Sequence, residues 1–143
     1  MTGQEYIAVA RENLEALNAG DRGRFRATLA ADSVYDEVGT RRRVLGSDRI
    51  TEAVHGWKRA FPNAKGTITN AVAGDGMVAL EVTWEGTYTG PLLGPGGVIA
   101  YSGSRQPKRA VHVFTFEGSK IKRFHQYYFD VTTLRQRVAA SSN

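Results

Sequence analysis

The feature that most constrains the fold is a change in hydrophobic period near Pro62. Before this residue, apolar side chains recur three and four apart, as in Tyr6, Val9, Ala10, Leu14 and Leu17. After it, apolar and polar residues alternate, so that one strand face collects Val78, Leu80, Val82 and Trp84. Amphipathic helices followed by alternating strands predict an α+β fold, in which the helices pack on one face of an antiparallel sheet.

Capping signals place the helices at residues 4–19, 22–30 and 47–60. Thr2 and Glu5 form a capping-box pattern for the first helix, and Ser47 is expected to cap the third. Asn13 shares the apolar face of the first helix, so its amide needs either an internal partner or a ligand.

The remaining segments indicate strands and turns. Residues 33–38 are typical of a strand, and an arginine-rich loop is expected after them. The turn Gly74-Asp75-Gly76 between two alternating runs predicts a hairpin. The segments 108–117 and 121–129 are the last two predicted strands, and a final helix is expected near Val131.

Composition excludes several classes of protein. The 143 residues suit one domain over 1–143, and the absence of cysteine excludes disulfides and thiol catalysis. The chain has no long apolar run and its first residues carry charge, which predicts a cytoplasmic protein without membrane contact. The net charge of +5 comes mainly from arginine, as at 41–43 and 105–109, but without the aromatic pattern of a nucleic-acid binder. No metal-ligand spacing, P-loop or dinucleotide fingerprint occurs, so we expect neither a metal site nor nucleotide chemistry.

Several segments together resemble one family. They are "AADSVYDEVG", "VTWEGTYTGPLLGPGG" and "GSKIKRFHQYYFDVTTLRQ". They resemble the nuclear transport factor 2-like superfamily, and in particular its SnoaL-like polyketide cyclase branch, over nearly the whole chain. The resemblance implies a cone-shaped α+β barrel that forms a homodimer through the outer sheet face. It also implies a small apolar or aromatic substrate and catalysis without a cofactor.

The cyclases of this branch carry an aspartate at the end of the last strand as general acid/base, and Asp130 matches that position. The run from Ile121 to Asp130 is one residue longer than the usual pattern, so a bulge is needed for Asp130 to face inward. The alternative for Asp130 is a helix N-cap, because aspartate is among the best capping residues.

The ketosteroid isomerases of the superfamily suggest a second carboxylate, since Asp36 precedes Gly39 by three residues as their general base does. His112 and Asn13 fall near the positions of their oxyanion donors. The alternatives are an ion pair of Asp36 with one of Arg41 to Arg43, and a hydrogen-bonded core histidine at 112.

The remaining candidates for substrate contact are aromatic and could equally be packing residues: Tyr35, Trp57, Trp84, Tyr88 and Tyr127. Tyr88 stands where the cyclases often carry histidine. The combined interpretation is a cofactor-free acid/base enzyme, most closely a polyketide cyclase that performs an intramolecular aldol reaction. The alternatives are an isomerase that uses Asp36 and a protein that only binds a small ligand.

Overall fold

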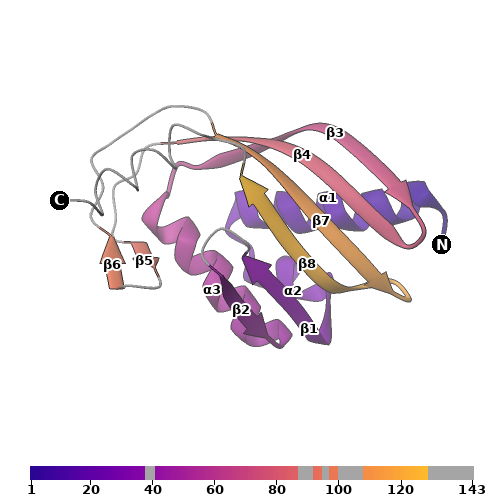
Figure 1. Cartoon of the computed structure of the whole chain (residues 1–143), viewed down its shortest axis with the longest axis horizontal. Helices are drawn as coiled ribbons and strands as arrows, with labels where there is room; N and C mark the ends of the chain where they lie inside the picture. Colours follow the sequence, from indigo (N-terminus) through magenta and orange to yellow (C-terminus); the bar gives the residue numbers. More distant parts are fainter. Residues whose placement is uncertain (38–40, 87–91, 95–96, 100–107, 129–143) are drawn as a thin grey trace.

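The computed structural model describes residues 1–37, 41–86, 92–94, 97–99 and 108–128 (Figure 1). Its helices are α1 (Gly3–Ala19), α2 (Arg22–Ala27) and α3 (Ser47–Ala60). Its strands are β1 (Leu29–Glu37), β2 (Arg42–Leu45), β3 (Lys65–Gly74), β4 (Met77–Glu85), β5 (Leu92–Gly94), β6 (Gly97–Ile99), β7 (Lys108–Glu117) and β8 (Lys120–Tyr128).

Six strands form one sheet in the order β2-β1-β8-β7-β4-β3, while β5 and β6 pair separately. The three helices lie on one face of this sheet, and the long strands bend over them (Figure 1). The α+β fold with helices on one sheet face is therefore confirmed. One pairing differs from the expected antiparallel sheet, because β8 runs parallel to β1. The long connection through α3 and the hairpins gives the chain enough length to return in the same direction.

The ends of α1 are those that the sequence predicts. Thr2 and Glu5 form a complete capping box, and Gly20 ends the helix with φ 68°. The prediction for α3 is wrong by one residue. Gly46 is the N-cap with φ 92°, and no side chain caps the helix. Ser47 already lies in the first turn, where its carbonyl accepts a hydrogen bond from Thr51 Oγ1 at 2.7 Å.

The transition from α2 to β1 comes earlier than expected. The helix ends at Ala27, where Thr28 donates its backbone N–H to the carbonyl of Phe25, and β1 begins at once. The Thr28 carbonyl then accepts from the Ile121 amide at 2.9 Å. This tertiary contact, which local propensity does not register, draws the segment into the sheet. The arginine-rich loop likewise contains a strand, β2, which pairs with β1.

The predicted alternation holds in the sheet. The hairpin turns at Asp75 and Gly76, both with positive φ, and even-numbered residues of β4 are buried. In β8, Arg123 pairs with Thr115 but Ile121 pairs with Phe116, so Lys122 is the extra residue of a bulge. The bulge that the family pattern required is therefore present. Beyond it, Phe124 and Gln126 of β8 are buried.

The core fills the space between the inner sheet face and the helices. Its largest fully buried side chains include Phe25, Phe114 and Phe124. Phe124 stacks on Phe114 at 5.8 Å between ring centroids and meets Phe25 edge-on at 6.5 Å. Complete burial of each such ring stabilises the fold by roughly 1.5–3 kcal/mol. Phe124 also contacts the Tyr35 ring, with 4.6 Å between the centroids, so this apolar layer adjoins the candidate site.

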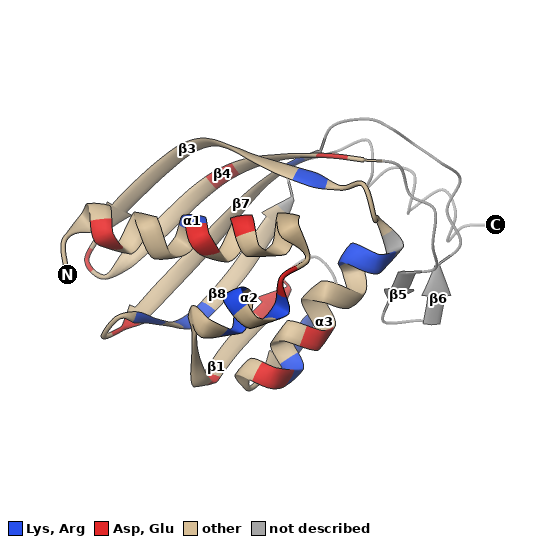
Figure 2. Ribbon diagram, turned by 180° about the vertical axis from the view of Figure 1, so that it is seen from behind, with Lys and Arg blue, Asp and Glu red and all other residues tan. Residues whose placement is uncertain are grey.

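The helices carry both basic and acidic residues (Figure 2). Ion pairs join α2 to α3, as between Arg26 and Asp48 at 2.8 Å. Both partners are well exposed, so each pair contributes at most about 1 kcal/mol. Among the helices that the structure describes, none has the length and apolar character needed to cross a membrane.

Candidate active site

A small cavity lies between the inner face of the sheet and helices α1 and α3. Its volume is about 20 Å³, enough for one water molecule in this conformation. The lining side chains are Leu17, Val54 and Trp57 from the helices, and Tyr35, Glu37, Arg42, Trp84 and Gln126 from the sheet. Three of the predicted substrate-binding residues, Tyr35, Trp57 and Trp84, thus lie together in this lining.

The aromatic wall of the cavity is built from two tryptophans. Trp57 on α3 meets Trp84 on β4 edge-on, with 5.0 Å between the ring centroids. Trp57 also stacks on Phe61 at 5.0 Å. Edge-to-face and stacked rings of this kind hold one another in place, so the wall presents flat apolar surfaces to the cavity.

A row of polar side chains crosses the inner face of the sheet beside this wall. Glu37 of β1 pairs with Arg42 of β2 on one side and with Gln126 of β8 on the other. Gln126 in turn pairs with His112 of β7. Residues directly opposite on neighbouring strands point to the same face. Four polar groups are therefore aligned across the inner face of the sheet.

Glu37 is the carboxylate of the cavity. Its Oε2 accepts hydrogen bonds from the Tyr35 hydroxyl at 3.1 Å and from Arg42 at 3.2 Å. The Glu37 side chain is only 16% exposed. Arg42 Nε is buried and has no hydrogen-bond partner within the part of the chain that the structure describes. The cavity thus combines an oriented carboxylate with a buried donor able to bind an oxygen atom.

His112 is fully buried at the other end of the polar row. Trp84 Nε1 donates to His112 Nε2 at 3.2 Å. Burial lowers the pKa of His112 from 6.5 to about 4, so the ring is neutral at pH 7. The histidine is a hydrogen-bonded core residue, and the Gln126 amide separates it from Glu37.

Asp36 lies on the opposite face of β1 from Tyr35 and Glu37. Its carboxylate binds Arg43 through two hydrogen bonds, of 2.7 and 3.3 Å. This contact, the largest influence, lowers the pKa of Asp36. The ion pair that we considered as the alternative for Asp36 is present, and the carboxylate is not part of the cavity lining.

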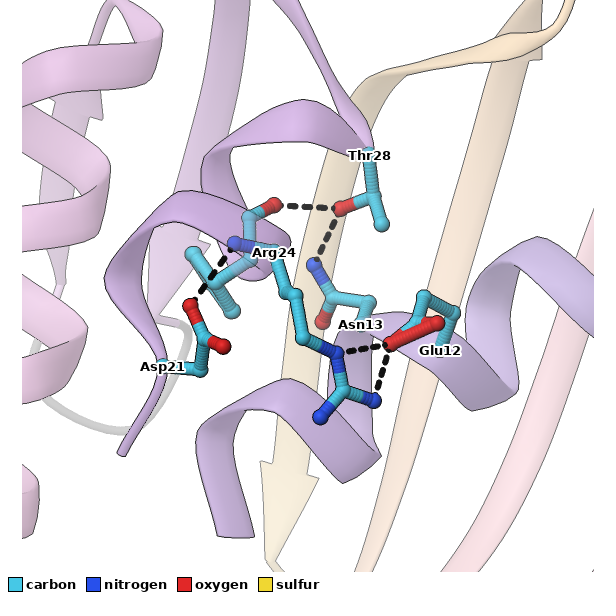
Figure 3. Close-up of polar contacts among 6 residues, drawn as sticks. Glu12, Asn13, Asp21, Arg24 and Thr28 are labelled. Atoms are coloured by element: carbon cyan, nitrogen blue, oxygen red, sulfur yellow. Dashed lines mark hydrogen bonds and ion pairs between the residues drawn. The ribbon is translucent and has the colours of Figure 1, made fainter. Parts of the chain in front are cut away.

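Asn13 finds an internal partner. Its Nδ2 donates to Thr28 Oγ1 at 2.9 Å, and this hydroxyl donates to the Phe25 carbonyl at 2.7 Å (Figure 3). Around this buried bond, Glu12 and Arg24 form an ion pair at the surface. The hydrogen bond accounts for a polar amide on the apolar face of α1, and Asn13 is not among the cavity-lining residues.

The other predicted residues fall elsewhere. Tyr127 is 42% exposed and packs edge-on against His125, away from the buried Gln126. Asp130, Tyr88 and the helix expected near Val131 lie outside the described residues.

His55 lies on the inward side of α3. Its side chain is buried against Phe25, and its Nδ1 contacts the Thr51 carbonyl at 3.1 Å. Burial lowers the pKa of His55. No group of three His, Asp or Glu side chains within the described parts of the chain is arranged to hold a metal ion.

Sequence reasoning did not single out Glu37, Arg42 or Gln126. For Glu37 a signal existed, because Tyr35 and Glu37 share one strand face while Asp36 belongs to the other. Arg42 and Gln126 have no motif of their own. Their importance follows only from the pairing of β2 and β8 with β1.

Comparison with known proteins agrees with this architecture. The profile of the SnoaL-like polyketide cyclases matches residues 7–137, so the chain belongs to this family. No curated protein matches the chain.

Solved structures share the fold at low sequence identity. A candidate SnoaL-like polyketide cyclase from Jannaschia sp. CCS1 superposes with a TM-score of 0.80 at 14% identity, over 93% of this chain and 90% of that one. TsrD from Streptomyces laurentii gives 0.77 at 18% identity, over 95% and 96% of the two chains. AclR, a candidate hydroxylase from Streptomyces galilaeus, gives 0.75 at 21% identity, over 97% and 98%.

Proposed function

We propose that this protein is a cofactor-free acid/base enzyme that acts on a flat, apolar small molecule bearing carbonyl groups. The reaction proposed is the intramolecular aldol cyclisation of a polyketide ester. The observation that carries the proposal is a largely buried carboxylate, Glu37, which is held by two donors and lines the same cavity as Trp57 and Trp84. Family membership supports the same substrate class.

The chemistry needs a base, a donor and an apolar wall. The base removes a proton from a carbon between two carbonyls, and the electron pair moves onto one carbonyl oxygen to form an enolate. A donor hydrogen-bonds this oxygen while the enolate carbon attacks a second carbonyl carbon within the same molecule. A carbon–carbon bond forms, and the new alkoxide takes up a proton. No electron is exchanged with an outside partner.

Two carboxylates are candidates for the base. Asp130 is proposed from the family pattern, in which the last strand ends in the catalytic aspartate. The bulge at Lys122 supports it, because the family pattern needs one there, and beyond the bulge Phe124 and Gln126 of β8 are buried. Glu37 is proposed from its position in the cavity lining. The buried N–H of Arg42 is suited to the oxygen of the substrate.

Amide variants separate the two candidates. Asp130→Asn and Glu37→Gln keep the side-chain shape but cannot accept a proton. Loss of the base should lower turnover of a diketo polyketide methyl ester by about 10²–10⁴-fold, with little change in unfolding midpoint. Asp32→Asn on β1 is the matched control, because this exposed carboxylate pairs with Lys122 at the surface. Turnover that is unchanged in both amide variants would reject acid/base catalysis and leave ligand binding alone.

A further inference from the structure

The contact between Trp84 and His112 fixes the position of a hydrogen atom. An indole N–H can only donate, and Trp84 Nε1 lies 3.2 Å from His112 Nε2. His112 Nε2 must therefore carry a lone pair. A neutral imidazole has one ring N–H, so the hydrogen of His112 resides on Nδ1.

The hydrogen on Nδ1 determines which way the neighbouring amide turns. With Gln126 Nε2 at 3.4 Å from His112 Nδ1, two donors would face each other. The two ends of a primary amide have nearly the same shape, so the hydrogen-bond network decides between them. Only the orientation with Oε1 toward His112 gives the buried Nδ1–H an acceptor.

The opposite side of Gln126 favours the same orientation. Glu37 is its direct neighbour on β1, in register and on the same face. An amide NH₂ group directed toward a carboxylate is favourable, whereas an amide oxygen in that place would be repelled. Two independent neighbours, His112 and Glu37, therefore assign the same end of the amide as the donor.

We infer that the side-chain amide of Gln126 is a hydrogen-bond donor of the cavity. His112 fixes the orientation of this amide, and Trp84 fixes the tautomer of His112. The ligand group it recognises is the oxygen of a flat aromatic molecule, either a carbonyl or an enol. This assignment rests on the proposed function, for which it supplies a donor beside the carboxylate. His112 and Trp84 are positioning residues, since Gln126 lies between His112 and the carboxylate.

The tautomer of His112 can be observed in the wild-type protein without any ligand. Long-range ¹H–¹⁵N NMR at pH 7 should show a protonated Nδ1 and an unprotonated Nε2. Trp84→Phe removes the indole N–H and should let the other tautomer appear. Trp57→Phe is the control, because it alters the same aromatic wall but should leave the ring hydrogen of His112 on Nδ1. A protonated Nε2 in the wild-type protein would overturn the inference.

Binding of two matched probes tests the donor itself. 2-Naphthol and naphthalene have the same ring system, and only 2-naphthol carries an oxygen. The wild-type protein should prefer 2-naphthol, and Gln126→Glu, which has no NH₂ group, should reduce this preference about tenfold while still binding naphthalene. A tenfold change corresponds to about 1.4 kcal/mol, the size of one hydrogen bond. An unchanged preference in Gln126→Glu would overturn the assignment.

The results also separate this inference from the proposed function. If the wild-type protein shows the Nδ1 tautomer and prefers 2-naphthol but turns over no carbonyl substrate, the enzymatic function is rejected and the assignment of Gln126 as a donor stands. If the protein turns over the substrate but His112 is protonated on Nε2, the enzymatic function stands and the assignment of Gln126 as a donor is rejected.

Discussion

The buried neutral His112 should make the protein less stable in acid. Its pKa is lowered from 6.5 to about 4, so between these values the unfolded chain binds a proton that the folded protein refuses. The contribution of neutral His112 to the free energy of unfolding is therefore complete above about pH 6.5 and is lost as the pH falls toward 4. At 1.36 kcal/mol per pKa unit, the lost free energy of unfolding is roughly 3 kcal/mol.

Urea unfolding measured between pH 7 and pH 4, at one protein concentration, provides the assay. The comparison is with His112→Gln, whose amide can accept from Trp84 but does not titrate. Burial also lowers the pKa of His55 and His125, but the wild-type protein and His112→Gln both contain these histidines, so their effect cancels in the comparison. The wild-type protein should therefore lose roughly 3 kcal/mol more than His112→Gln over this range. Parallel curves for the two proteins would refute the neutral buried histidine.

Two further predictions concern packing and assembly. Gly66→Ala should lower the free energy of unfolding by roughly 1–3 kcal/mol, because the new Cβ would lie 2.9 Å from the Trp84 ring. The backbone cannot easily move away, since the Asn18 amide binds both the N–H and the carbonyl of Gly66. Thermal unfolding measures the effect, and Gly74→Ala on the same strand is the control, because its Cβ would have nothing within 4 Å. Equal effects of the two substitutions would contradict this packing. The protein should also sediment as a homodimer of about 31 kDa, twice the chain mass of 15.7 kDa. The reason is that apolar side chains are exposed on the outer sheet face, and such surfaces favour association. These side chains are Leu45, Val72, Met77 and Tyr127. A 15.7 kDa species alone at micromolar concentration would reject the dimer.

Most of the fold could be predicted because its signals are local. The capping box at Thr2, the C-cap at Gly20 and the turn at Gly76 each depend on a few neighbouring residues. The parallel pairing of β1 with β8 and the strand β2 could not be predicted in this way. Both depend on contacts between distant segments, and local propensity carries no information about such contacts.

The candidate site was predicted less completely, for a related reason. The aromatic wall could be anticipated, since Trp84 falls on the apolar face of an alternating strand. Asp36 matched a family pattern, but strand alternation directs the next residue, Glu37, to the cavity instead. Gln126 could not be recognised, because its role depends on strand register and on the tautomer of His112.

The proposed enzyme removes a proton from carbon, and hydrogen–deuterium exchange measures this step directly. 2-Tetralone, a flat bicyclic ketone, would be incubated with the protein in D₂O and the loss of its C–H signal followed by NMR. We predict that the wild-type protein accelerates this exchange and that Asp130→Asn or Glu37→Gln lowers the rate by about 10²–10⁴-fold. Exchange with the wild-type protein at the rate of buffer alone would contradict the claim.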